Sequence, residues 1–304
     1  MSEFGYRNVW YDARKRRVHL WTWDEDGNRK EVIEPFKPYL YVETSTQGDA
    51  VSIFGTNLKK MVFPSQFDRR RYVKECGVKR LFYNHKAEQQ FLLDKYLGLN
   101  DSPDFSSQPL KIFRLDIEVY SPHEFPHATE AKHPIDLLTV HDSIHDQFHT
   151  FGLKPYTPTL PNVTYHYCKS EKDLLTQFLD FWTDDYPDVM TGWNSDGFDT
   201  PYIVNRITNV LGEDHARSLS PVNSIYFRPD IVTKFGKSMG RWVIHGVNVI
   251  DYKEIYELFS REPREAYNLN YISHVELGEG KTAYNATSLA QLSVTDWVLV
   301  STYR

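Results

Sequence analysis

The sequence predicts a mixed α/β fold that follows a β-rich N-terminal domain. Before Gln108, short apolar runs alternate with turn-forming residues, as in an antiparallel meander. After it, strand-like segments alternate with segments of helical spacing. The polar stretch DSPDFSSQ, Asp101–Gln108, separates the two patterns and has the composition of a connector. We therefore expect one domain over 1–108 and a second over 109–304, which agrees with the chain length of 304 residues.

The first domain is expected to hold a meander followed by two helical segments. Turn residues at Ala13–Arg16 and Asp24–Asn28 separate its first three strands. The expected elements are strands at Tyr6–Asp12, Arg17–Trp23, Arg29–Ile33 and Tyr39–Glu43, and helical segments at Ser65–Cys76 and His85–Leu97.

The second domain is expected to open with an apolar strand and to continue as a mixture of strands and helices. Ser170 and Asp173 form a variant of the capping box, which predicts a helix start. The expected elements are strands at Lys111–Tyr120, Leu137–His141, Gln147–Phe151, Val189–Gly192 and Val247–Tyr252, and helices at Ser170–Trp182 and Pro201–Leu211. The second and third of these strands should pair as a hairpin.

Composition narrows the class of protein. The 35 basic and 41 acidic residues give a formal net charge of −6, which argues against broad nonspecific binding of duplex DNA but leaves room for a local groove. The 2 cysteines, Cys76 and Cys168, form no metal-binding spacing. There is no apolar run of about 18 residues and no secretory start, so a soluble intracellular protein is expected.

Two carboxylates interrupt the first strand of the second domain. Asp116 and Glu118 lie two residues apart in KIFRLDIEVY, and residues i and i+2 of a strand share a face. Neighbouring carboxylates raise each other's pKa, and a divalent cation removes this conflict because hard cations prefer oxygen ligands. An edge strand whose polar face meets water would explain the pair equally well.

A third carboxylate follows the predicted strand Val189–Gly192. In MTGWNSDGFD, Asp199 comes after a turn-forming stretch and directly before a helix that Pro201 opens. Either Asp199 or Thr200 is expected to be the N-cap. Asp199 is then a simple cap, or it faces Asp116 and Glu118 at the end of the strand.

Both segments resemble one protein family. The order of DIE, then TGWN-x-x-GFD, then VNVIDYKEIY is similar to the exonuclease region of family B DNA polymerases, most closely the replicative polymerases of T-even-like tailed phages. AKHPID, HDSI and the N-terminal PFKPYLYVE resemble the same family. The resemblance implies a ribonuclease-H-like 3′→5′ exonuclease domain with a mixed sheet, behind a β-rich N-terminal domain, acting in proofreading during DNA replication.

The resemblance also implies a metal-dependent mechanism. Two divalent ions, Mg²⁺ or Mn²⁺, would stabilise the attacking and leaving oxygens during hydrolysis of a 3′-terminal phosphodiester of single-stranded DNA. Asp116 would bridge both ions, Glu118 would bind the ion on the nucleophile side, and Asp199 would serve the second ion.

Several further residues are implied to contact DNA. Phe125 occupies the family position that packs against the terminal bases, where an ordinary loop anchor is the alternative. Asn194 and Phe198 are expected to contact the end of the DNA strand. Alternatively, they only shape the turn of the second motif. Lys237 and Arg241 belong to KFGKSMGR, at the place of a family β-hairpin, and are expected to contact phosphate, although a solvated turn explains them equally well.

The end of the sequence suggests a part of a longer enzyme. Tyr303 falls where the third exonuclease motif has its tyrosine, which would orient the attacking water, and the aspartate position of that motif would lie beyond Arg304. The polymerase signatures of the SLYPS and GDTD type are absent from the sequence. We therefore expect a polymerase piece as partner, primer–template DNA as substrate, a sliding clamp reached through that piece, and no membrane partner, in the cytoplasm of an infected host cell.

Other functions stay open at this point. A noncatalytic subunit could bind nucleic acid and dock to a separately encoded polymerase piece. A free-standing nuclease could act on RNA, because nothing in the motifs reads the 2′-hydroxyl. A zinc site is a further possibility for His123, His127 and His133, but their spacing matches no tight pair of zinc ligands.

Overall fold

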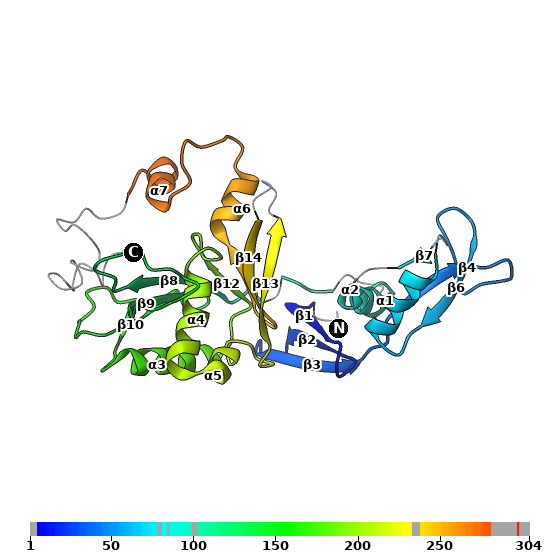
Figure 1. Ribbon diagram of the computed structural model, residues 1–304, viewed down its shortest axis with the longest axis horizontal. Helices are drawn as coiled ribbons and strands as arrows, with labels where there is room; N and C mark the ends of the chain where they lie inside the picture. Colours follow the sequence, from blue (N-terminus) through cyan, green and yellow to red (C-terminus); the bar gives the residue numbers. More distant parts are fainter. Residues whose placement is uncertain are drawn as a thin grey trace. The chain divides into compact units, whose positions relative to one another are not determined.

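A computed structural model describes residues 5–77, 81–83, 86–98, 103–106, 108–232, 238–280 and 297. The chain forms two compact units, Met1–Pro109 and Leu110–Arg304, each with its own set of sheets and helices (Figure 1). Among the helices of the described residues, none is both long enough and apolar enough to cross a bilayer.

The first unit holds two small antiparallel sheets. The three-stranded sheet has the order β1-β2-β3, and the four-stranded sheet has the order β5-β6-β4-β7. The strands are β1 Asn8–Asp12, β2 Arg17–Trp23, β3 Arg29–Pro35, β4 Tyr39–Glu43, β5 Ala50–Val51, β6 Asn57–Val62 and β7 Leu81–Phe82, and the helices are α1 Gln66–Glu75 and α2 Ala87–Tyr96. The prediction of one four-stranded meander was wrong, because Tyr39–Glu43 pairs with β6 and β7 in the other sheet.

The second unit is built on a six-stranded mixed sheet with the order β11-β10-β9-β8-β12-β15. β9 pairs antiparallel with both β8 and β10, so the predicted hairpin is confirmed, and the remaining neighbours are parallel. The strands are β8 Ile112–Val119, β9 Ile135–Asp142, β10 Gln147–Gly152, β11 Val163–Tyr167, β12 Val189–Gly192 and β15 Asn248–Asp251. β13 Ile225–Val232 and β14 Ser238–Ile244 form a separate antiparallel pair.

Helices α3 Glu171–Asp184 and α4 Asp199–Leu211 cover this sheet and enclose one apolar core with it (Figure 1). The Ser170 side chain caps α3 by accepting the Asp173 N–H, as the capping pattern predicted. Further helices among the described residues are α5 Glu213–Arg217, α6 Tyr252–Phe259 and α7 Leu269–Leu277. The sheet and the two long helices therefore form the frame on which the loops at the strand ends are held.

The start of α4 differs from the prediction. Phe198 is the N-cap, and Asp199 is the first helical residue, so Pro201 lies two positions further in than expected. Pro201 still falls within the first turn, where a backbone N–H has no intrahelical acceptor, and proline is tolerated there for that reason. The Asp199 side chain is therefore not used as a helix cap.

The core has an aromatic centre at Trp182. Its side chain is fully buried, its Nε1 donates to the Leu219 carbonyl at 2.9 Å, and its ring meets Phe113 edge-on. Replacing Trp182 by Ala should lower the free energy of unfolding of this unit by about 3–5 kcal/mol, because a large cavity opens in a closed core. Urea unfolding followed by circular dichroism measures the change.

Trp182→Phe is the conservative variant, and it should cost less because only part of the volume and one hydrogen bond are lost. Phe125→Ala is the control, since that ring is 73% exposed and its loss should change stability by less than about 0.5 kcal/mol. Equal losses for Trp182→Ala and Phe125→Ala would contradict the central position of Trp182.

Candidate active site

Strand β8 presents its two carboxylates on the face opposite the core. Along it, Leu115 and Ile117 are buried, whereas Asp116 is exposed and Glu118 is half-buried. This alternation follows the two-residue period of a strand. A register irregularity between Glu118 and Val119 ends the regular pairing with β9 just after the second carboxylate. Asp116 and Glu118 therefore project together at the end of the strand, as predicted.

The Asp199 carboxylate reaches this same strand. Asp199 is only 5% exposed. Burial raises the pKa of Asp199 well above its usual range, and the negative charges of Asp116 and Glu118 raise it further. The backbone N–H of Ile117, the residue between Asp116 and Glu118, lowers the pKa of Asp199, as does the backbone N–H of Asp199 itself. Three side chains from two distant segments are thus brought into one electrostatic cluster, which we refer to as the carboxylate cluster.

The side chains of the carboxylate cluster offer only oxygen atoms as ligands, and the charges of Asp116 and Glu118 oppose the ionisation of Asp199. Both properties suit a hard divalent cation, which prefers oxygen ligands and would offset the repulsion. In the part of the chain that the structure describes, however, no three acidic, histidine or cysteine side chains have the arrangement of a finished metal centre. The donor set fits a divalent ion in chemistry, with Asp116, Glu118 and Asp199 as the residues that could hold it.

The loop between β12 and α4 sets the position of Asp199. Gly192 lies so close to β8 that a Cβ there would be 2.7 Å from the Leu115 carbonyl oxygen, so only glycine fits. Asn194 has a left-handed backbone with φ 62°, and its carbonyl accepts the N–H of Gly197 and of Phe198. The loop is therefore a tight, internally bonded turn and not a flexible connection.

Asp251, at the end of β15, holds this loop from the side. Its carboxylate accepts the backbone N–H of Asn194 at 3.0 Å and of Asp196 at 3.3 Å, and it also caps α6 through the Lys253 N–H at 2.9 Å. Burial raises the pKa of Asp251, and these three backbone donors lower it. We expected no role for Asp251 from the sequence, although its place after a strand and before an apolar helix is typical of a cap.

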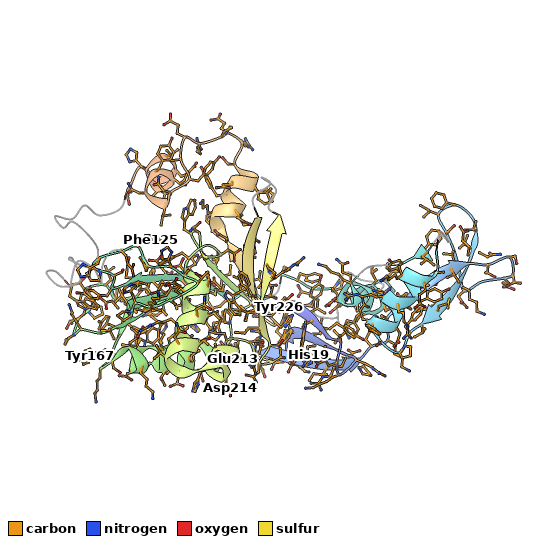
Figure 2. The ribbon with its side chains drawn as sticks, in the orientation of Figure 1. His19, Phe125, Tyr167, Glu213, Asp214 and Tyr226 are labelled. Carbon is orange, nitrogen blue, oxygen red and sulfur yellow. The ribbon has the colours of Figure 1, made fainter. Side chains whose placement is uncertain are left out.

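Phe125 and Phe198 form an aromatic pair, and Phe198 directly precedes Asp199 of the carboxylate cluster in the chain. Phe125 is exposed, as Figure 2 shows, and its ring centroid lies 5.8 Å from that of Phe198, which in turn lies 5.4 Å from Tyr202. An exposed ring that packs against a second ring is a suitable surface for stacking a nucleic-acid base. These two predicted DNA contacts are therefore brought together.

Helix α4 also braces the loop that carries Phe125. The Tyr202 hydroxyl donates to the His133 carbonyl at 2.7 Å, and the Arg206 guanidinium donates to the Ala131 carbonyl at 3.0 Å. Ala131 is fully buried with a left-handed φ of 43°, a strained backbone for a residue with a side chain. Arg206 and Tyr202 thus fix the loop after β8 in a defined conformation.

The remaining predicted contacts are placed differently. Asn194 is exposed, and its side-chain oxygen accepts the Lys253 Nζ at 3.3 Å. Arg241 is paired with two carboxylates, those of Asp196 and Glu254, which favours a structural role over the predicted contact with phosphate. Lys237 and Tyr303 lie outside the described residues.

Comparisons with known proteins agree with this arrangement. Residues 82–272 match the family model described as DNA polymerase family B, exonuclease domain. The chain is 30% identical over 300 residues to the DNA-directed DNA polymerase of Escherichia phage RB69, and 25% identical over 290 residues to that of Enterobacteria phage T4. Each alignment covers 86% of this chain and 32% of the phage enzyme, so the chain spans about a third of the length of these relatives.

A more distant relative is matched over a shorter stretch. The DNA polymerase catalytic subunit of Human herpesvirus 8 is 35% identical over 112 residues, which cover 34% of this chain and 10% of that protein. The family model, by contrast, covers more than half of the chain and includes all three members of the carboxylate cluster. The chain belongs to DNA polymerase family B and carries the exonuclease domain of that family, with the ribonuclease-H-like fold that the sequence predicted.

Proposed function

We propose that this chain hydrolyses the 3′-terminal phosphodiester of single-stranded DNA, as the proofreading part of a family B DNA-directed DNA polymerase. The observation that carries the proposal is the position of the Asp199 carboxylate, which is buried close enough to β8 that the charges of Asp116 and Glu118 raise its pKa. Such a cluster is costly for the fold unless it serves a cation, and perturbed carboxylates of this kind are typical of active sites.

Asp116, Glu118 and Asp199 are the residues that would hold two divalent cations. Bound there, Mg²⁺ or Mn²⁺ would lower the pKa of a water molecule and offset charge on the departing 3′ oxygen. The residues of the chain position the substrate and the carboxylates. Phe125 and Phe198 would stack on the terminal bases of the DNA, and the loop from Gly192 to Phe198 holds Asp199 in the carboxylate cluster. Tyr303 as an orienting residue for the water stays a prediction.

The partners of the chain and its place in an infected cell are also proposals. The phage relatives are whole polymerases, and we infer that this chain works with a polymerase piece on primer–template DNA inside an infected cell. A sliding clamp would be reached through that piece. The competing function is a noncatalytic subunit that binds DNA and docks to the polymerase piece.

Replacing Asp116 by Ala tests the proposed activity. It should slow Mg²⁺-dependent trimming of a 5′-labelled single-stranded oligonucleotide by about 10²–10³-fold, the usual effect of removing one group that stabilises transition-state charge. Asp180→Ala, an exposed acid on α3, is the matched control and should have no effect. The assay is run with the chain alone and with the proposed polymerase piece. Trimming by the Asp116 variant at the wild-type rate contradicts the catalytic role, and no turnover in either condition favours the noncatalytic subunit.

Asp199→Asn tests the electrostatic cluster without an activity assay. Because burial and two like charges raise the pKa of Asp199 in the folded protein, its ionisation destabilises the fold as the pH rises above the ordinary value of 3.8. In chelator at neutral pH, the Asn variant should therefore unfold at a higher temperature than the wild type, by about 2–4 °C for each kcal/mol relieved. At pH values below the ordinary pKa, where the carboxyl is protonated in both states, this difference should vanish.

Mg²⁺ should raise the unfolding temperature of the wild type more than that of the Asn variant, since the variant has lost one ligand. A variant that is less stable than the wild type at neutral pH in chelator would show that the Asp199 charge does not oppose folding.

Phe125→Ala tests the stacking surface. Its loss should raise KM for single-stranded DNA by an amount that corresponds to about 1–3 kcal/mol for one stacked base, with a smaller change in kcat. Phe125→Trp, which keeps an aromatic face, should retain the wild-type KM. Steady-state kinetics on oligonucleotides of one length measures both constants, and an unchanged KM for the Ala variant excludes the stacking role.

A further inference from the structure

Arg241 joins three separate elements of the second unit. It lies on β14, its Nε is 3.1 Å from Oδ2 of Asp196 in the loop before α4, and its Nη2 contacts both carboxylate oxygens of Glu254 on α6. These three residues form what we name the Arg241 cluster. A planar guanidinium can engage two carboxylates at once, which an ammonium group does less well.

Asp196 is the buried member of the Arg241 cluster. The residue is 4% exposed, and burial raises its pKa to about 6, while the charge of Arg241 lowers it. At neutral pH the carboxylate is therefore ionised beside the guanidinium. Removing the cation would leave a buried negative charge with Asp251 and Glu254 nearby, both of which raise the same pKa. The loop would then have to shift so that the Asp196 carboxylate reaches water.

The backbone at Asp196 connects directly to the carboxylate cluster. The Asp196 N–H is bonded to Asp251, and the neighbouring Ser195 carbonyl accepts the Thr200 N–H at 2.9 Å. Asp199 lies between these two anchor points, at the first position of α4. A shift of Asp196 therefore moves the residue that carries the third carboxylate.

Arg241 also lies on a strand pair that has no further strand neighbour among the described residues. β13 and β14 pair only with each other, and they join the rest of the unit through side chains such as Ile244, which is buried in the main core. Arg228 stands opposite Arg241 in the register, so two positive charges face each other across the pair. The carboxylates of Asp196 and Glu254 offset this repulsion and tie the strand pair to the loop.

We propose that Arg241 is a positioning residue, which holds the loop bearing Asp199 against β14 through the buried carboxylate of Asp196. The inference rests on the proposed exonuclease function. It differs from a contact with DNA phosphate, because the guanidinium side chain is only 26% exposed, is hydrogen-bonded to Glu254 and forms an ion pair with Asp196.

The test combines Arg241→Met, which replaces the guanidinium by an unbranched uncharged side chain, with Asp196→Asn, which removes the buried charge. Arg241→Met should lower kcat for trimming of single-stranded DNA by about 10–100-fold, the range for residues that support metal ligands. KM should change little. Adding Asp196→Asn should restore much of kcat, because no uncompensated carboxylate is left in the loop. Glu254→Gln is the matched control and should have a smaller effect, since Glu254 is the more exposed partner.

A DNA-contacting Arg241 would behave differently. Arg241→Met would then raise KM and weaken its dependence on salt, by the same factor with or without Asp196→Asn. That result, or an unchanged kcat in Arg241→Met, overturns the proposal.

Hydrogen–deuterium exchange provides a readout that needs no activity. Exchange at the backbone amides of Asn194 and Asp196 should increase in Arg241→Met and return toward the wild-type rate in the double variant. If Asp116→Ala shows that the chain has no exonuclease activity, this exchange pattern still tests the positioning role. Unchanged exchange in Arg241→Met refutes it.

Discussion

The arrangement of the second unit depends on the placement of one buried carboxylate against a strand that already carries two. The Asp199 side chain is buried, and the charges of Asp116 and Glu118 oppose its ionisation. A fold that only had to be stable would gain by replacing this residue with a neutral one. The neighbouring loops instead hold it in place, as expected where a site is organised for chemistry and not for stability.

The supporting contacts share one property, which is that they act on the backbone of the loops around the carboxylate cluster. Asp251 accepts N–H groups of the loop before α4, and Arg206 donates to carbonyls of the loop after β8. Gly192 lets β12 approach β8 more closely than any side chain would allow. Rigid loops at the ends of strands are a common way of holding catalytic groups on an α/β frame.

Membership of family B places this arrangement in the context of polymerases. The matched exonuclease region includes β8, α4 and β15, which supply the carboxylate cluster and the cap that supports it. Within the same region, the Arg241 cluster connects the loop before α4 and helix α6 with the β13–β14 pair. Arg241 could contact phosphate or support the loop, and only the supporting role requires Asp196. The buried position of Asp196 favours the supporting role.

The sequence by itself determined the main elements and the identity of the three carboxylates. Strong periodicity and a recognisable cap located α3, and the two-residue period of β8 placed Asp116 and Glu118 on one face. Such local patterns are visible in a sequence because neighbouring residues produce them. Three other features were decided by the tertiary structure: the assignment of β4 to a second sheet, the start of α4 at Asp199, and the ion pairs of Arg241. Each depends on groups far apart in the chain, and the burial of Asp196 that gives Arg241 its partner exists only once the loop, β14 and α6 have packed together.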